Sequence, residues 1–320
     1  MRAVIHDHGL QFRSDYPDPI PGEGECLIRV HYAGICSTDL QLLSGYLNFR
    51  GILGHEMVGT VISGSSAWRG KRVVSEINCV CRRCDLCQSG LAAHCRHRTV
   101  MGIVGRDGCF ADTLCVPERN LHLVPDAVTD EEAVFVEPLA AAHQVLVQCP
   151  IEPRMNVSVV GSGRLGLLVA QVLRNTGCKL TVIGRNRQKL LFCEKQGIQG
   201  IHLDDLVAKR DRDVVVECSG SPDGLRTAMD LVRPRGTIVL KSTSADAGNV
   251  NLWPIVVHEV RVIGSRCGPF PEAIHALARK AVDVRPLISR ILPLEKAEEA
   301  FAASTRPDML KTLFKINARP

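Results

Sequence analysis

The feature that most constrains this fold is the stretch VSVVGSGRLGLLVAQ, residues 157–171. A β-branched run leads into three glycines in G-x-G-x-x-G spacing: Gly161, Gly163 and Gly166. The first glycine permits a tight turn, the second lets a pyrophosphate approach the backbone, and the third permits close helix packing. Arg164 and Leu165 then open a helix whose N-terminus would face the phosphates. We predict a dinucleotide-binding turn; the alternative is a glycine-rich turn that binds nothing.

The chain after residue 154 alternates short apolar strands with amphipathic helices. Candidate strands are NVSVV, KLTVIG, DVVVECSG, TIVLKST and VRVIG, and a helical run follows each of the first three. Parallel strands that are covered on both faces read as near-continuous apolar runs joined by helices. We therefore predict an α/β fold with a doubly wound parallel sheet.

The end of the second of these strands indicates which cofactor would bind. An acidic residue usually stands there and holds the ribose hydroxyls, but this chain has Gly184 followed by Arg185. The missing carboxylate removes repulsion against a 2′-phosphate, and an arginine can pair with phosphate bidentately. We predict NADP(H) over NAD(H); the alternative is that Arg185 and Arg187 only cap a solvated helix start.

The first 130 residues have a different pattern. Runs rich in β-branched and apolar residues are separated by Gly or Pro, which predicts short strands at 25–34, 56–63, 71–77 and 109–116. Residues 131–147 predict a helix that Pro138 kinks or breaks. A chain of 320 residues with two such patterns is long enough for two domains.

Four cysteines have the spacing C-x2-C-x2-C-x7-C: Cys81, Cys84, Cys87 and Cys95. Short spacings bring thiolates to the corners of a tetrahedron, and four thiolates form a closed structural zinc site. Cys79 falls outside the spacing, and His94 and His97 are not needed as ligands. The sequence has 14 cysteines but neither a signal-peptide pattern nor a membrane-length apolar run, so we expect a cytoplasmic protein with reduced thiols.

Three further segments carry residues of metal-binding type, although no local spacing links them. GICSTDL contains Cys36, Thr38 and Asp39, GHE contains His55 and Glu56, and VFVEPLA contains Glu137. Taken singly, these residues are equally compatible with a buried thiol, a turn histidine and a helix-start carboxylate.

Five motifs occur along the chain in this order: GICSTDL, GHE, the four-cysteine segment, EPLA and GSGRLG. This ordered set resembles the zinc-dependent medium-chain dehydrogenase/reductase family over essentially the whole chain. That family includes alcohol, sorbitol and threonine dehydrogenases. The resemblance implies a GroES-like, β-rich catalytic domain over 1–145, with a structural zinc lobe at about 79–97. A Rossmann domain would follow over 146–270, and 271–320 would return to the catalytic domain. The active site would lie in the cleft between the domains, with one catalytic and one structural zinc per chain.

The same resemblance implies a ligand set for the catalytic zinc. Cys36 and His55 would bind the ion, and Glu137 would be the third ligand, directly or through water. Glu56 would be a neighbouring or alternate ligand. Asp39 would hold the free nitrogen of His55, which orients the ring and raises its basicity.

The resemblance also implies a route for the substrate's proton. Thr38 would take the proton of the substrate hydroxyl, but Gln41 stands where many alcohol dehydrogenases have a relay histidine, so the proton must leave by another group or by water. Lys241 and Arg266 are unusual charges in segments that line the nicotinamide side of the cleft in the family. They would contact an anionic or hydroxylated substrate or the cofactor phosphates, or else be solvated loop charges.

We therefore predict an oxidoreductase that transfers a hydride between an alcohol, favouring secondary alcohols and polyols, and NADP(H) or NAD(H). Reduction of a biosynthetic aldehyde, ketone or imine is the alternative within the family. A zinc-ribbon module that binds nucleic acid would leave the glycine pattern unexplained, and the net charge of +5 is too small for it. A catalytically silent cofactor-binding protein would not need Cys36, His55 and Glu137 together.

We expect a small-molecule substrate, no nucleic-acid or membrane partner, and a homo-oligomer, either a dimer or a tetramer.

Overall fold

The computed structural model describes residues 1–243 and 251–319, and the chain divides into two compact units. Unit 1 comprises Met1–Glu137, Ala273–Lys280 and Val284–Pro320, and unit 2 comprises Pro138–Glu272 and Ala281–Asp283. Within the described ranges, no helix is both long enough and apolar enough to cross a membrane.

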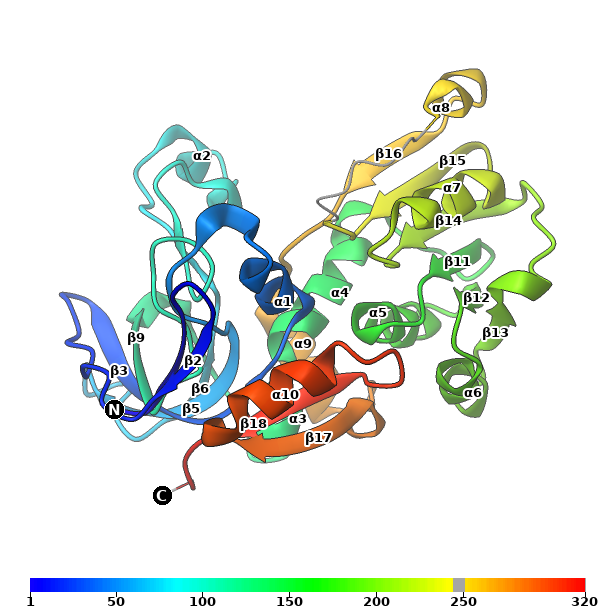
Figure 1. Cartoon of the computed structure of the whole chain (residues 1–320). Coiled ribbons are helices and arrows are strands. Elements are labelled where there is room, and N and C mark those ends of the chain that lie inside the picture. Colours follow the sequence, from blue (N-terminus) through cyan, green and yellow to red (C-terminus); the bar gives the residue numbers. More distant parts are fainter. Residues whose placement is uncertain (244–250, 320) are drawn as a thin grey trace. The chain divides into compact units, whose positions relative to one another are not determined.

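Unit 2 is built on a six-stranded sheet in which every neighbouring pair is parallel, in the order β13-β12-β11-β14-β15-β16 (Figure 1). The strands are β11 (Asn156–Val160), β12 (Lys179–Gly184), β13 (Gln199–His202), β14 (Arg212–Glu217), β15 (Val232–Leu240) and β16 (Arg261–Gly264). The first three strands and the last three form two halves that meet at β11 and β14. This arrangement confirms the predicted doubly wound parallel sheet.

Helices precede these strands or connect them (Figure 1). They are α4 (Val136–Gln148), α5 (Arg164–Arg174), α6 (Arg187–Lys195), α7 (Pro222–Leu231) and the short α8 (Trp253–Val257). The sheet and α7 bury an apolar cluster that includes Val160, Ile183, Val215 and Met229. Burial of these β-branched and large apolar side chains is the main stabilising term for such a layer.

Unit 1 is a mostly antiparallel β structure. Its main sheet has the order β10-β6-β5-β3-β18-β17, and β9 also pairs with β3. The strands are β3 (Glu25–Gly34), β5 (Glu56–Ser63), β6 (Arg72–Ser75), β9 (Thr113–Pro117), β10 (Leu121–Leu123), β17 (Ile288–Pro293) and β18 (Lys311–Lys315). The last two strands come from the C-terminal part of the chain, and β18 pairs antiparallel with β3.

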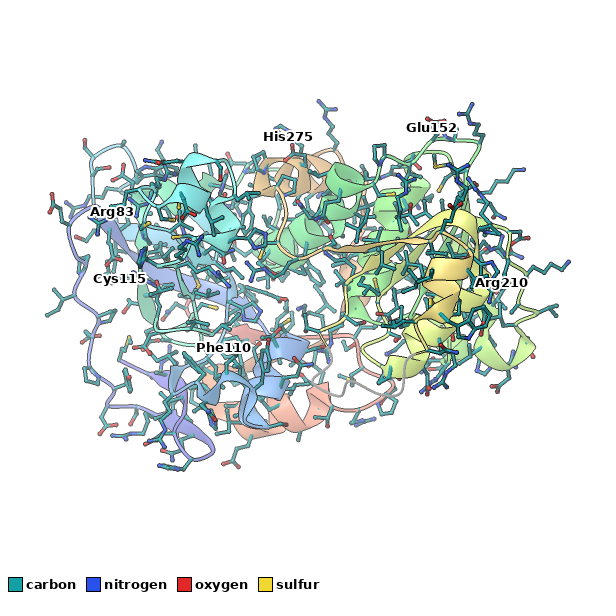
Figure 2. The ribbon with its side chains drawn as sticks, turned by 90° about the horizontal axis from the view of Figure 1, so that it is seen from above. Arg83, Phe110, Cys115, Glu152, Arg210 and His275 are labelled. Carbon is teal, nitrogen blue, oxygen red and sulfur yellow. The ribbon has the colours of Figure 1, made fainter. Side chains whose placement is uncertain are left out.

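Smaller elements complete unit 1. A second sheet joins β1 (Ala3–His6), β2 (Leu10–Arg13) and β4 (Gly51–Ile52), and a third joins β7 (Asn78–Cys79) to β8 (Thr99–Val100). Its helices include α1 (Ser37–Leu43), α2 (Asp85–Gln88), α3 (Asp130–Ala133) and α10 (Ala297–Ser304), and α9 (Phe270–Ala278) brings the chain back into this unit. Phe110, labelled in Figure 2, is fully buried and contacts Phe301 and Phe314 edge to face.

The predicted helix over 131–147 is two helices, α3 and α4, and the break lies before Pro138. Pro138 stands in the first turn of α4, where a backbone N–H has no partner within the helix and its absence costs little. The break falls instead at Val134 and Phe135, both of which are buried. The expectation of a kink at Pro138 was therefore wrong.

Candidate active site

The four cysteines of the predicted structural zinc site form one group. The sulfurs of Cys81, Cys84, Cys87 and Cys95 all lie within 4.8 Å of one another. Cys84 precedes α2, and Cys95 Sγ accepts backbone N–H groups from Cys81 and His97, each at 3.4 Å. Neither His94 nor His97 belongs to the group, and Cys79 also lies outside it.

The electrostatics of this group fit a divalent cation. Backbone N–H groups of Arg96 and Cys87 lower the pKa of Cys84 to about 6, so its thiolate is favoured at neutral pH. Burial and hydrogen bonds to Cys84 and Cys95 raise the pKa of Cys87 to about 12, so a proton remains among these sulfurs. A zinc ion would replace that proton and hold all four groups as thiolates.

A second group brings together Cys36, His55 and Glu56, whose ligand atoms also lie within 4.8 Å of one another. Cys36 caps α1 two residues after the end of β3, and His55 directly precedes Glu56, the first residue of β5. Since β3 and β5 are antiparallel neighbours, with Gly34 opposite Glu56, residues far apart in sequence meet at one end of this strand pair. Sulfur, imidazole and carboxylate together are a donor set that zinc accepts.

Asp39 lies where it can orient His55. Its Oδ2 accepts the backbone N–H of Cys36 at 2.7 Å, and its Oδ1 is 3.2 Å from His55 Nδ1, although that pair is not aligned for a hydrogen bond. Burial lowers the pKa of His55, but the Asp39 carboxylate and the Cys36 sulfur outweigh it, and the pKa stands well above its ordinary value. The structure thus places the Asp39 carboxylate beside His55 Nδ1.

The two candidate glutamates differ in their surroundings. Glu56 is fully buried: its Oε2 is paired with Lys311 Nζ, and its Oε1 has no hydrogen-bond partner among the described residues. Glu137 is half-buried in the first turn of α4 and does not belong to the group formed by Cys36, His55 and Glu56. No sequence pattern predicted the contact between Glu56 and Lys311, because the two residues are 255 positions apart.

Thr38 lies beside the same group. Its hydroxyl oxygen is 3.7 Å from Cys36 Sγ, and the residue lies in the first turn of α1. A hydroxyl in this position can accept or donate a proton next to the candidate metal ligands.

The glycine-rich turn in unit 2 has the geometry that its pattern predicts. Gly161 has φ +112°, and a Cβ on it would lie 2.7 Å from the backbone of Cys218. A Cβ on Gly166 would lie 1.8 Å from Gly161 O, whereas nothing lies within 4 Å of a Cβ on Gly163. Gly163 caps α5, which starts at Arg164 and Leu165. The turn is therefore tight on the protein side and open on the side where a pyrophosphate would approach.

The end of β12 explains the missing acidic residue. A Cβ on Gly184 would lie 2.1 Å from Ser162 Oγ, so this position leaves little room for a side chain. Arg185 is exposed, and its guanidinium lies 3.7 Å from the exposed Asp223 carboxylate. Because exposed ion pairs contribute little, a phosphate can take the place of Asp223 beside Arg185.

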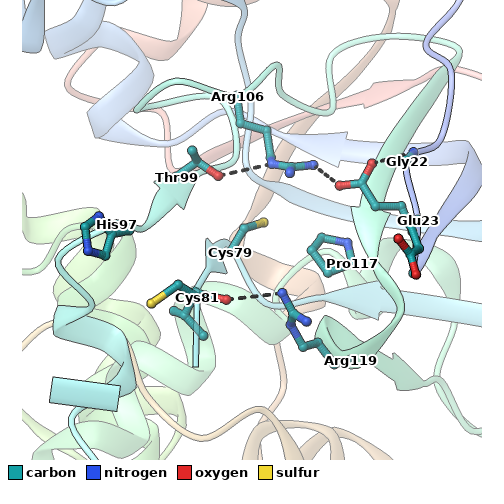
Figure 3. Close-up of a pocket in the computed structure, with 12 residues that line it drawn as sticks. Gly22, Glu23, Cys79, Cys81, His97, Thr99, Arg106, Pro117 and Arg119 are labelled. Carbon is teal, nitrogen blue, oxygen red and sulfur yellow. Dashed lines mark hydrogen bonds and ion pairs between the residues drawn. The ribbon is translucent and has the colours of Figure 1, made fainter. Parts of the chain in front are cut away.

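A separate pocket of about 410 Å³ lies beside the four-cysteine group (Figure 3). Arg106 and Arg119 line it, but Arg106 pairs with Glu25 at 2.8 Å and Arg119 donates to Val80 O at 3.1 Å. Cys36 and His55 are not among its lining residues, so the pocket is distinct from the candidate metal centre.

Comparison with known families identifies the chain. Residues 22–126 match the alcohol dehydrogenase GroES-like domain, and residues 165–282 match the zinc-binding dehydrogenase domain. The chain belongs to the zinc-dependent medium-chain dehydrogenase/reductase family. The predicted family, the GroES-like and Rossmann fold classes, and the assignment as an oxidoreductase are confirmed.

Relatives of this dehydrogenase cover nearly its full length. It is 29% identical to the sorbitol dehydrogenase of Halalkalibacterium halodurans over 98% of both chains. It is 28% identical to the 2-dehydro-3-deoxy-L-galactonate 5-dehydrogenase of Pseudoalteromonas atlantica over 93% of each. Among solved structures, a zinc-binding dehydrogenase from Sinorhizobium meliloti bound to NADP is similar, with a TM-score of 0.89 and 28% identity over 98% of each chain.

Proposed function

We propose that this dehydrogenase transfers a hydride between a secondary alcohol or polyol and NADP(H). The observation that carries the proposal is the gathering of Cys36, His55 and Glu56 in a chain that also has an open dinucleotide turn. Relatives named for sorbitol and for a sugar acid support hydroxylated, sugar-like substrates. Reduction of an aldehyde, ketone or imine would use the same groups in the opposite direction.

Two zinc ions per chain fit these residues. Cys81, Cys84, Cys87 and Cys95 would hold the structural ion, and Cys36 and His55 would hold the catalytic one. Glu137 would be the third ligand on the family resemblance alone, and Glu56, whose carboxylate lies beside Cys36 and His55, would be the alternate. When bound with an open coordination position, zinc supplies a Lewis acid. Asp39 would keep the His55 ring oriented, because its carboxylate lies behind Nδ1.

A side chain beside the candidate metal ligands would transfer the proton of the substrate hydroxyl to water. Thr38 would accept the proton from the substrate hydroxyl and pass it on to water, because Gln41 cannot titrate. A Thr38→Val variant is expected to lose turnover while it keeps its zinc and its cofactor affinity. Full turnover in that variant would remove Thr38 from the scheme.

The cofactor would bind along unit 2. The turn from Gly161 to Gly166 would take the pyrophosphate, and Gly184 with Arg185 would accommodate the 2′-phosphate. When bound, the nicotinamide supplies the hydride acceptor or donor.

Titration with both reduced cofactors tests the 2′-phosphate assignment. We expect NADPH to bind more tightly than NADH, and we expect Arg185→Gln to remove most of that difference. Arg210→Gln is the matched control, since Arg210 also forms an exposed pair, with Asp230. Tighter binding of NADH by the native chain would contradict the assignment. A screen of polyols with NADP⁺, followed by NADPH absorbance, tests the substrate class.

The homo-oligomer would form at the outer edge of the unit 2 sheet. β16 is the last strand in the order, and the adjoining α8 exposes Trp253, Val256 and Val257 at 55%, 78% and 63%. A second copy could extend the sheet edge to edge and cover these apolar side chains, as an isologous interface does. Light scattering of the native chain and of Val256→Glu tests this: the variant is expected to dissociate, and an unchanged mass would contradict the placement.

A further inference from the structure

Lys241 follows the last residue of β15 and is buried, with 7% of its surface exposed. The hydrogen bonds of its ammonium include those to Ala141 O at 2.7 Å, to Arg266 O at 2.9 Å and to Ser265 Oγ at 3.1 Å. Lys241 is therefore not a solvated loop charge, and its donors already point at protein oxygens rather than at a substrate.

These three bonds join segments that are far apart in sequence. Ala141 lies in α4, whereas Ser265 and Arg266 follow β16. The same loop approaches α4 a second time, because a Cβ on Gly268 would lie 1.8 Å from Ala140 O. Ser265 N also donates to Leu240 O at 2.9 Å, which ties the loop to the end of β15. Lys241 thus stands at the centre of a brace formed by α4, the end of β15 and the loop 265–268.

The position of this brace in the sheet gives it a role. In a doubly wound sheet, a dinucleotide lies across the carboxyl ends of the strands, with one mononucleotide on each half. The glycine turn after β11 and Arg185 after β12 belong to the half that would take the adenosine. The ends of β15 and β16 belong to the other half, so the nicotinamide would bind there.

We propose that Lys241 is a positioning residue that fixes the loop 265–268 for the nicotinamide half of the cofactor, without touching the adenosine half. The inference rests on the proposed cofactor binding. It extends that proposal because it assigns separate residues to the two halves of one ligand. Removal of the ammonium frees the loop from α4, and ordering the loop again on binding weakens the affinity for the nicotinamide part alone.

Calorimetric titration with two probes tests the assignment. The first probe is NADPH, and the second is 2′-phospho-ADP-ribose, which has the adenosine half and the pyrophosphate but lacks the nicotinamide. For Lys241→Met we expect the Kd of NADPH to rise about tenfold, which corresponds to about 1.4 kcal/mol. The Kd of the fragment is expected to stay within about twofold, because the fragment lacks the nicotinamide that the loop would contact. Lys195→Met, at an exposed lysine of α6, is the matched control and should change neither value.

The other outcomes separate the two proposals. Equal weakening of both probes would show a general loss of structure in unit 2. An unchanged Kd for NADPH would show that the brace does not serve the cofactor. Either result overturns the inference about Lys241 but leaves the proposed cofactor binding in place. A native chain that binds neither probe would overturn the proposed cofactor and this inference together. If circular dichroism shows that Lys241→Met does not fold, Ser265→Ala is measured instead, because it removes one acceptor of the Lys241 ammonium. We expect the Kd of NADPH to rise while the Kd of the fragment does not change. If neither Kd changes, or both rise equally, the proposed role of Lys241 is overturned.

Discussion

Lys311→Met should strongly destabilise unit 1, because it leaves a buried carboxylate without its cation. Lys311 comes from β18 and is 2% exposed, while the side chain of Glu56, with which it is paired, is fully buried. Lys311 Nζ also donates to Ile35 O at 3.2 Å. Methionine has a similar length but no donor, so the substitution removes both interactions with little change in packing.

The expected loss of unfolding free energy is about 3–5 kcal/mol, the usual effect of removing one partner of a buried ion pair. Neither side chain is solvent-exposed, so screening by water does not reduce this figure. A loss of this size is a large part of the roughly 5–15 kcal/mol that stabilises a typical domain. Urea unfolding of the zinc-loaded protein, followed by circular dichroism, would measure it. Lys315→Met, at the exposed end of the same strand, is the control and should cost far less.

A double variant checks the physical reason. Lys311→Met combined with Glu56→Gln removes both charges of this pair, so it should be more stable than Lys311→Met alone. The reasoning is refuted if Lys311→Met costs less than about 1 kcal/mol, the range of an exposed pair. It is also refuted if the double variant loses the full sum of the two single effects.

Two further predictions concern other parts of the chain. Gly166→Ala places a Cβ 1.8 Å from Gly161 O, so we expect it to abolish NADPH binding and lower the melting temperature; unchanged calorimetric binding would contradict this geometry. Burial raises the pKa of Glu132, but the Thr129 N–H, Lys280 and Arg285 outweigh it and hold the pKa below its ordinary value. A lowered carboxyl pKa contributes its full stabilisation above the ordinary value of about 4.3, and this contribution is lost as the pH falls through the pKa in the folded protein. The difference in unfolding free energy between the native chain and Glu132→Gln should therefore be present at neutral pH. It should shrink as the pH falls below about 4.3. A difference that is the same in acid and at neutral pH would contradict the assignment.

The parts of the fold that local patterns specify could be predicted from the sequence. The G-x-G-x-x-G turn and the alternating strands and helices predicted the parallel sheet, because each of these signals lies within one stretch of chain. The four-cysteine group was predictable for the same reason, since its members lie within fifteen residues of sequence. Its sulfurs do come together in the structure.

The remaining features depend on contacts between distant segments. Cys36 meets His55 and Glu56 only because β3 and β5 pair, and no spacing in the sequence shows this. The burial of Lys241 depends on α4 and the loop after β16, so a charged residue at a strand end could not be told from a solvated one. The break before α4 was misplaced because the rule for proline depends on its position within a helix.

The central claim, a catalytic metal centre separate from a structural one, is tested most directly by zinc content. Plasma mass spectrometry would be applied to the tag-free native chain, to Cys36→Ser and to Cys95→Ser. The two ligand groups predict two zinc ions in the native chain and one in each variant. A native chain with a single zinc that Cys36→Ser leaves in place would contradict the account, because only the four-cysteine group would then hold metal.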